Sequence, residues 1–190
     1  MTSQIPPHLS LYATRKEIHE RVQKAAVKIN AWAGEVLAQT NEQVLGLCIL
    51  RGGVFFFSDL LRQMSVSVEP AFCRTWSYSS RTNQQVNKSV RVNVEDVVAE
   101  GRAILLVDDI CDSGSTLRKL SNVLLDLGAT DVRSVVLVHR EVAVPNYQPT
   151  WTIFQHAGPQ WFVGYGMEDR NRYANLPDLY TMAGQTEGSP

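Results

Sequence analysis

The sequence has few cysteines, and their number and spacing argue against disulfide bonds and against a zinc site. Cys48, Cys73 and Cys111 are odd in number and form no Cys-x-x-Cys pair. Neither a disulfide framework nor a zinc site is therefore indicated. Because Cys48 and Cys111 lie in or beside apolar runs, we expect them to be buried, reduced thiols.

Long apolar runs and blocks of one charge are also missing. Nothing approaches the roughly 18 apolar residues of a membrane span, and the first residues show no basic segment followed by an apolar core. We therefore expect no membrane partner and a cytoplasmic location. The chain has 18 Lys and Arg against 19 Asp and Glu, a net charge of -1, and no Lys/Arg block. This gives no electrostatic reason to expect a nucleic-acid partner.

The length and composition fit one compact domain. The chain has 190 residues, of which 44% are apolar and 19% charged, which argues against disorder and allows a substantial core. No internal repeat or linker divides it. We predict a single domain over residues 1–190, with flexible ends at 1–10 and 183–190.

Helix and strand signals alternate along the chain. Thr14 and Glu17 form a capping-box pattern that predicts a helix to about residue 37, and a second helix is predicted over 55–64. Unbroken apolar runs predict buried strands at 44–50, 104–107 and 134–138. The pattern indicates an α/β fold with a doubly wound, mainly parallel sheet, whose ligands lie at the carboxyl ends of the strands. The polar segment 79–88 lacks periodicity and predicts a mobile loop.

The segment 104–117, ILLVDDICDSGSTL, carries the clearest functional signal. A strand ends in two carboxylates, and a Gly/Ser/Thr loop then opens a helix. Free N–H groups and the positive end of the helix dipole bind anions at such a position. Gly114 allows close backbone approach, and the hydroxyls of Ser113, Ser115 and Thr116 add donors. The loop is therefore predicted to bind a phosphate.

The two carboxylates point to a different part of the ligand. Asp108 and Asp109 carry the same charge as a phosphate and do not usefully contact it. Carboxylates accept hydrogen bonds from vicinal hydroxyls and hold Mg²⁺ through water. Phosphate, diol and metal groups at one site indicate a sugar phosphate.

This pattern resembles the phosphoribosyl-pyrophosphate (PRPP) signature of type I phosphoribosyltransferases: a strand, two acidic residues, two variable positions and D-[ST]-G-x-T. Leu50-Arg51-Gly52-Gly53 before an aromatic-rich helix is similar to the first PRPP loop of the hypoxanthine-guanine members, where the backbone, often through a cis peptide, meets pyrophosphate. The matches run in order from about residue 50 to 177. The resemblance implies the type I phosphoribosyltransferase fold, in which a small hood is built from N- and C-terminal segments.

The resemblance also implies a role for each motif in transferring the 5-phosphoribosyl group of PRPP to a purine. Asp112 is the implied general base or hydrogen-bond acceptor, and Ser77 with Tyr78 resembles a catalytic loop that closes over the site and excludes water. Mg²⁺ is the implied cofactor, held by Asp108, Asp109 and Glu168. The implied PRPP-binding residues are Arg51, Gly52, Gly53, Asp108, Asp109, Ser113, Gly114, Ser115 and Thr116.

The segment 161–169 resembles the base-binding part of the family. Trp161 would stack on a purine, which is worth about 1–3 kcal/mol by analogy with stacked nucleic-acid bases, and Phe162 would help to read the base edge. A plain aromatic core strand is the alternative for Trp161. The implied partners are PRPP and a purine base, and the implied assembly is a homodimer or homotetramer.

The chain departs from the family pattern at three positions, one of which is Trp76 at a usually basic position just before Ser77 and Tyr78. An ungapped alignment from the DSGST loop puts Arg140 where 6-oxopurine enzymes have a lysine, and a shift of one residue puts His139 there. Arginine and lysine are not interchangeable at a tight site, so the preferred purine stays open. Ala174 stands where the family often has an arginine, for which Arg170 or Arg172 could compensate.

Two other classes of function stay open. A regulator of the same fold could bind PRPP or a nucleotide without catalysis and act on RNA or a partner protein. A phosphoribosyltransferase for adenine or a pyrimidine is the other class. Trp161 and the segment after it favour a 6-oxopurine, whereas Arg140 weakens that argument.

Overall fold

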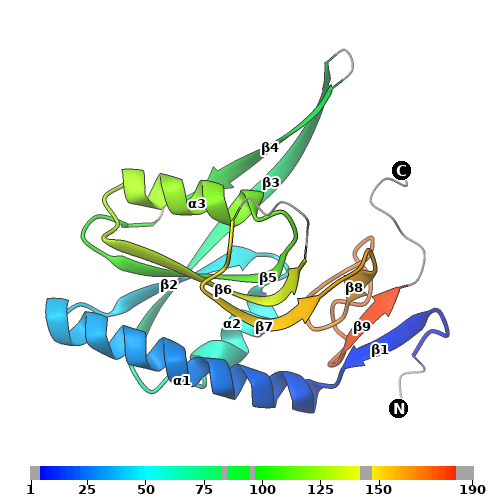
Figure 1. Cartoon of the computed structure of the whole chain (residues 1–190), viewed down its shortest axis with the longest axis horizontal. Coiled ribbons are helices and arrows are strands. Elements are labelled where there is room, and N and C mark those ends of the chain that lie inside the picture. The colour runs from blue at the N-terminus through cyan, green and yellow to red at the C-terminus, as the bar shows by residue number, and fades with distance from the viewer. Residues whose placement is uncertain (1–4, 83–84, 95–96, 142–146, 183–190) are drawn as a thin grey trace.

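The computed structural model describes residues 5–82, 85–94, 97–141 and 147–182, with the backbone alone for 76–92. A six-stranded sheet has the order β4-β3-β2-β5-β6-β7, and its strands are parallel except for β4. The expected doubly wound, mainly parallel sheet is confirmed (Figure 1). Its strands are β2 (Val44–Leu50), β3 (Val68–Thr82), β4 (Gln85–Asn93), β5 (Ala103–Cys111), β6 (Asp131–Arg140) and β7 (Trp151–His156).

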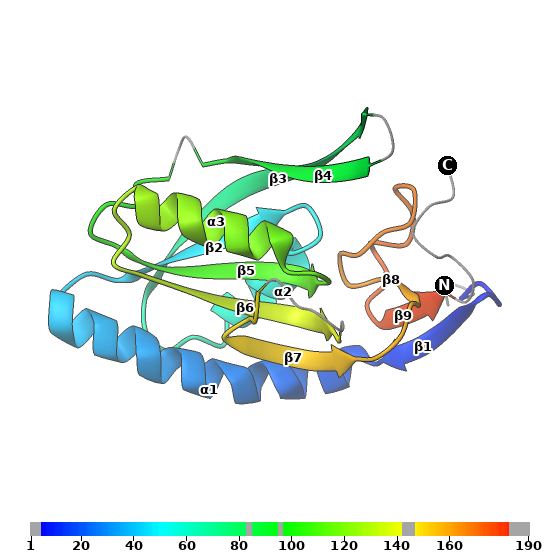
Figure 2. The same cartoon turned by 45° about the horizontal axis from the view of Figure 1, so that its top comes forward.

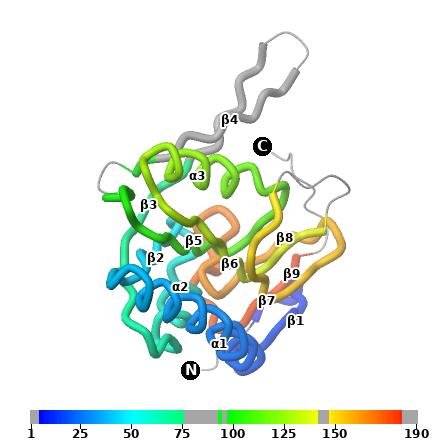
Figure 3. Tube along the Cα trace, turned by 60° about the vertical axis from the view of Figure 1, so that its left-hand side comes forward, coloured from blue at the N-terminus to red at the C-terminus, as the bar shows by residue number. Residues whose placement is uncertain are grey.

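Helices cover both faces of this sheet. Figure 3 shows α1 (Arg15–Thr40) and α2 (Val54–Leu61) on one face and α3 (Ser115–Asp126) on the other. The predicted capping box of α1 is present, because the Thr14 hydroxyl accepts the Glu17 N–H while the Glu17 carboxylate accepts the Thr14 N–H. The helix ends at Asn41, which adopts a left-handed conformation with φ 58°.

Strand β5 lies between two hydrophobic cores, which explains its unbroken apolar run. Leu105 and Val107 belong to the core under α1 and α2, whereas Ile104 and Leu106 belong to the core under α3. Successive side chains of a strand point to opposite faces. Both faces must therefore be apolar up to Asp108, and Ile110 and Cys111 beyond the acidic pair still pack against the two cores.

A second, three-stranded antiparallel sheet forms the hood, in the order β1-β9-β8. Strands β1 (Leu9–Ala13) and β9 (Leu179–Met182) come from opposite ends of the chain and pair with each other, and β9 also pairs with β8 (Trp161–Val163). Figure 2 shows the hood beside the carboxyl ends of β5, β6 and β7. The predicted hood of N- and C-terminal segments is confirmed.

The expected flexible N-terminal end needs a correction at its last residues. Leu9 and Ser10 pair with Met182 and Thr181 in the hood. Leu9 is buried against Val163 and Tyr180, and that burial offsets the entropy of ordering the segment. Residues 1–4 and 183–190 lie outside the described part of the chain.

The predicted loop over 79–88 is wrong for most of its length. β3 pairs with β2 as far as Arg74, and from Arg74 to Thr82 it pairs antiparallel with β4. The segment forms strands because backbone N–H and C=O groups of the two halves satisfy each other. It shows no apolar pattern because this pairing continues beyond the edge of β2, away from the two cores.

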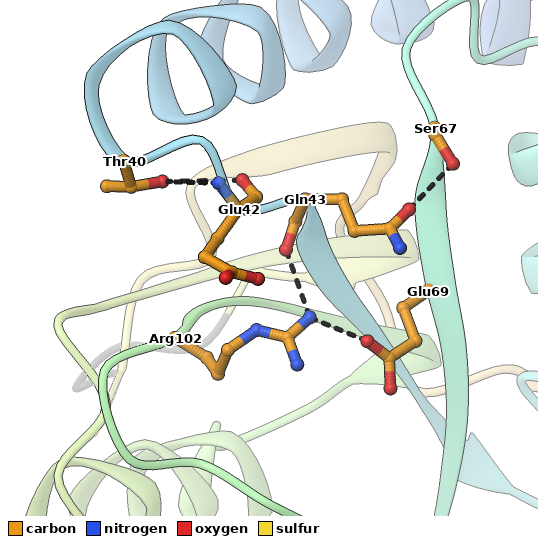
Figure 4. Close-up of polar contacts among 6 residues, drawn as sticks. All are labelled: Thr40, Glu42, Gln43, Ser67, Glu69 and Arg102. Carbon is orange, nitrogen blue, oxygen red and sulfur yellow. Dashed lines mark hydrogen bonds and ion pairs between the residues drawn. The ribbon is translucent and has the colours of Figure 1, made fainter.

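A polar cluster joins the strands at the edge opposite the hood (Figure 4). Arg102 donates to the Gln43 carbonyl at 3.0 Å and to Glu69 at 2.7 Å, and the Ser67 hydroxyl donates to the Gln43 side chain at 2.6 Å. These bonds link the starts of β2, β3 and β5. This edge therefore serves stability, and the opposite edge is left for ligands.

The cysteines are as expected, and the helices add one negative finding. Cys48, Cys73 and Cys111 are free and buried, and burial, reinforced by the charge of Asp108, raises the pKa of each thiol to about 12. They are therefore unreactive thiols.

Within the described ranges, no helix combines the length and the apolar character that crossing a membrane requires.

Candidate active site

Two adjoining cavities lie at the carboxyl ends of the parallel strands. The first, which we call the loop cavity, has a volume of about 330 Å³ and is lined by Ile49–Gly52, Thr75 and Asp108–Leu117. It brings together most of the predicted PRPP-binding residues. Gly53 is not in the lining, but a Cβ there would lie 2.8 Å from the Ile49 carbonyl. Gly53 therefore allows the turn that places its neighbours.

The second cavity, the aromatic cavity, has a volume of about 270 Å³ and opens between the sheet and the hood. Its own lining comes from β6, β8 and the segment after β8: Arg140, Trp161, Phe162, Gly166, Met167 and Glu168. Five residues line both cavities: Arg51, Gly52, Asp109, Ile110 and Asp112. The predicted donor and acceptor halves of the site therefore meet at a shared wall.

The predicted phosphate-binding loop is a tight turn at the start of α3. Gly114 has φ +76°, and a Cβ there would lie 2.6 Å from the Tyr147 Cβ, so the position favours glycine for both strain and space. The Ser113 and Ser115 hydroxyls lie 2.9 Å apart. Because α3 begins at Ser115 and residues 113–117 line the loop cavity, the start of this helix lies at the cavity, where helix N-termini can bind anions.

Gly52 brings the first loop against the acidic pair. A Cβ at Gly52 would lie 1.8 Å from Asp109 Oδ2, so no side chain fits there unless the carboxylate moves. The Leu50–Arg51 peptide bond before it is cis. The backbone after β2 thus lies directly beside the carboxylates of β5.

Asp108 is buried and Asp109 is half-buried, and the two form an acidic pair at the end of β5. The Asp109 N–H donates to Asp108 Oδ1 at 3.0 Å, and the Ile110 N–H donates to Asp109 Oδ1 at 2.9 Å. Burial and the charge of Asp109 raise the pKa of Asp108 well above its usual value, and burial also raises the pKa of Asp109. Across the described residues, no Lys or Arg pairs with either. This uncompensated charge suits a bound cation.

Arg51 connects the first loop to the segment after β8. Its guanidinium pairs with Glu168 and donates to Asn171 at 3.1 Å. Glu168, the predicted metal ligand, therefore lines the aromatic cavity while paired with Arg51. In the parts of the chain that are described, no three His, Cys, Asp or Glu side chains converge as a metal cage.

Arg140, and not His139, faces the aromatic cavity. Arg140 Nε donates to Asp112 Oδ1 at 2.6 Å, and its two Nη atoms donate to the carbonyls of Gly158 and Gln160. His139 is buried, and among the described residues neither of its ring nitrogens has a hydrogen-bond partner. The alternative alignment of His139 with the family's lysine therefore has no support in the geometry.

The two aromatic residues of β8 differ in their surroundings. Trp161 is 36% exposed and lines the aromatic cavity, and its indole N–H donates to the Glu168 carbonyl at 3.2 Å. Phe162 is 3% exposed and packs edge-on against Tyr12 and His156. Trp161 is therefore available for stacking, whereas Phe162 belongs to the core and presents one edge to the cavity.

Some expected residues lie elsewhere, and others were missed. The side chains of Ser77 and Tyr78 fall outside the described part of the chain, although both residues lie in β3. Arg172 pairs with Asp169 at 3.1 Å, and neither it nor Arg170 lines the two cavities. The residues that sequence reasoning missed include Thr75, Ile110 and Cys111 in the cavity linings and Asn171, which accepts a hydrogen bond from Arg51.

Replacing Asp108 by Asn should stabilise the fold at neutral pH, because the amide oxygen can still accept the Asp109 N–H while the buried charge is removed. Because the pKa of Asp108 is higher in the folded state than in the unfolded state, its ionisation lowers the free energy of unfolding as the pH rises between these two pKa values. The loss is complete above the folded-state pKa and absent below the unfolded-state pKa. We expect D108N to raise the free energy of unfolding by about 1–2 kcal/mol at pH 8 and by nearly nothing at pH 3.

Thermal unfolding at the two pH values measures this difference. D126N, which removes an exposed carboxylate at the end of α3, is the matched control and should change little at either pH. A D108N variant that is less stable than the wild type at pH 8 would contradict the prediction.

Comparisons with known proteins agree with this geometry. Residues 15–170 match the family model for the phosphoribosyl transferase domain. The chain is 30% identical over 174 residues to the hypoxanthine phosphoribosyltransferase of Haemophilus influenzae, covering 89% of this chain and 92% of that protein. It is 27% identical over 168 residues to the hypoxanthine-guanine-xanthine phosphoribosyltransferase of Tritrichomonas foetus, covering 85% and 84%.

A solved structure shares the fold. The hypoxanthine phosphoribosyltransferase of Staphylococcus aureus superposes with a TM-score of 0.82 at 19% identity, covering 96% of each chain. The family match spans most of the chain and includes the loop after β5, the acidic pair and the start of the segment after β8. The chain therefore belongs to the phosphoribosyltransferase family.

Proposed function

We propose that this phosphoribosyltransferase is a purine salvage enzyme that transfers the 5-phosphoribosyl group of PRPP to hypoxanthine or guanine, forming the nucleoside 5′-monophosphate and pyrophosphate. One observation carries the proposal: an aromatic cavity with Trp161 shares Asp109 and Asp112 with the loop cavity. A purine stacked on Trp161 would thus lie beside a bound sugar phosphate. The names of the relatives support a 6-oxopurine as the acceptor.

Each part of PRPP has a matching group in the loop cavity. The 5′-phosphate would bind the hydroxyls and N–H groups of residues 113–116, and the ribose hydroxyls would donate to Asp108 and Asp109. Pyrophosphate would meet Gly52 and the Arg51 guanidinium. Arg51 would stabilise the negative charge that grows on the leaving group.

Mg²⁺ fits this donor set. The acidic pair supplies oxygen ligands without a competing cation, and Mg²⁺ is usually bound by one or two carboxylates together with substrate phosphates and water. The described residues contain no cluster of three or more metal-ligating side chains, which agrees with a Mg²⁺ ion that takes part of its ligands from the substrate. Asp108 and Asp109 would hold the ion with substrate oxygens, and Glu168 would join them on leaving Arg51. Bound Mg²⁺ would stabilise charge on the pyrophosphate.

Asp112 is placed to act on the acceptor base. It lines both cavities, so its carboxylate can accept the N–H of a purine imidazole ring stacked on Trp161. That bond would help electron density reach the attacking nitrogen as the sugar carbon becomes oxocarbenium-like. The remaining expectation, a homodimer or homotetramer, is part of the proposal, and the exposed side chains of Phe55 and Phe72 would suit an apolar contact between copies.

Incubation with PRPP, Mg²⁺ and one base at a time tests the proposal. Hypoxanthine and guanine should give the 5′-monophosphates, and adenine and uracil should give at least about 100-fold less product. The rate of product formation with xanthine shows whether a site with Arg140 accepts a third 6-oxopurine. PRPP binding with no product from any base would favour the regulator, and product from adenine or uracil alone would favour the other class of transferase.

Replacing Asp112 by Asn should lower turnover by about 100-fold or more while PRPP affinity changes little, because Asp112 acts on the base. Steady-state kinetics with hypoxanthine and a direct PRPP titration separate the two quantities. Equal losses of turnover and PRPP affinity would contradict the role of the carboxylate as an acceptor.

Replacing Gly52 by Ala should weaken Mg²⁺–PRPP binding about tenfold or more, because the added methyl displaces Asp109. Isothermal titration calorimetry measures the affinity. G34A is the control, since its Cβ would lie 3.8 Å from Val66 at ordinary contact distance in α1. Unchanged PRPP affinity in G52A would show that the closeness of Gly52 to Asp109 has no part in binding.

A further inference from the structure

The contacts of Arg140 suggest a role other than that of the family's lysine. We propose that Arg140 is a positioning residue, which holds Asp112 in place and ties it to the segment that leads into Trp161. The proposal rests on the proposed function, because it assigns Asp112 to the purine imidazole. It goes further by stating how the proton acceptor and the stacking surface keep their relative positions.

A single guanidinium makes three contacts in three directions. Nε donates to Asp112 Oδ1 at 2.6 Å, one Nη donates to the Gly158 carbonyl, and the other donates to the Gln160 carbonyl at 3.1 Å. The Arg140 side chain is 15% exposed, whereas that of Asp112 is 43% exposed. The largely buried arginine is therefore the fixed partner, and it restrains a more open carboxylate.

The two carbonyls give this restraint a direction. Gly158 and Gln160 lie between β7 and β8, and Trp161 follows Gln160 directly. Arg140, at the end of β6, thus joins the loop after β5 to the start of β8. The guanidinium carbon also lies 5.7 Å from the centre of the Phe162 ring. One side chain therefore connects both walls of the aromatic cavity.

The choice of arginine follows from this task. A guanidinium is planar and offers five N–H donors in a rigid fork, so it can hold a carboxylate and two carbonyls at once. A lysine ammonium carries the same charge at a single point and cannot reproduce that spread. Because Nε binds Asp112 Oδ1, the carboxylate keeps Oδ2 for the purine.

A double-mutant cycle tests whether Arg140 acts through Asp112. We expect R140Q to lower kcat with hypoxanthine by about 10- to 100-fold, with little change in PRPP affinity, because a misplaced acceptor costs rate. The R140Q/D112N double variant should be about as slow as D112N alone, since residues that act as one unit give non-additive effects. R140K should stay nearly as slow as R140Q, because Arg140 contributes through the several N–H donors of its guanidinium and not through its positive charge.

Arg133 provides a matched control on the same strand. Its Nε donates to Asp131 Oδ2 at 2.9 Å, at the other end of β6 and outside both cavities. R133Q should keep wild-type kcat, which measures the general effect of removing an arginine from this strand. If R140Q does not fold, the cycle is run with R140K and R140K/D112N.

Three results would overturn the proposal. Additive losses in the double variant would show that Arg140 acts independently of Asp112. A raised KM for hypoxanthine at unchanged kcat would show that Arg140 reads the base directly. Wild-type turnover in D112N would remove the acceptor role of Asp112, and in that case the mechanism given under the proposed function fails as well.

Discussion

The burial of β5 on both faces is the constraint on which the site depends. Its apolar residues alternate between two cores, and β2 and β6 pair with it on either side. A strand held in this way keeps Asp108 and Asp109 side by side at its carboxyl end, where both line the loop cavity. Their burial raises the pKa values of both carboxyl groups. The hydrophobic core thus places two carboxylates together at the site, which is the donor set that the proposed Mg²⁺ would use.

The hood is connected to this site through two arginines. Arg51 bonds Glu168 and Asn171, and Arg140 bonds the carbonyls of Gly158 and Gln160. Each arginine stands at or just after the end of a central strand, and each partner lies in the segments around β8. Arg51 belongs to the wall that the two cavities share, and Arg140 bonds Asp112, which is also in that wall. Donor and acceptor substrates would thus meet at a place that neither sheet could build alone.

Most of the central fold could be predicted from local patterns. The capping box at Thr14 and the strand at 44–50 have the bounds expected, because capping and two-sided burial leave direct traces in nearby residues. The polar stretch 79–88, where the end of β3 pairs with β4, leaves no such trace, since its stability comes from backbone pairing. The hood strand β1 was also missed, because its partner β9 lies at the far end of the chain.

The sequence by itself determined the chemistry of the donor half of the site, because the acidic pair, the phosphate-binding loop and the strand before them are contiguous. The tertiary structure decided the acceptor half, where residues distant in the chain meet. Whether His139 or Arg140 lines the aromatic cavity depends on which side chain the end of β6 turns toward the hood. Neighbouring residues look equivalent in a sequence, and only the positions of Asp112, Gly158 and Gln160 distinguish them.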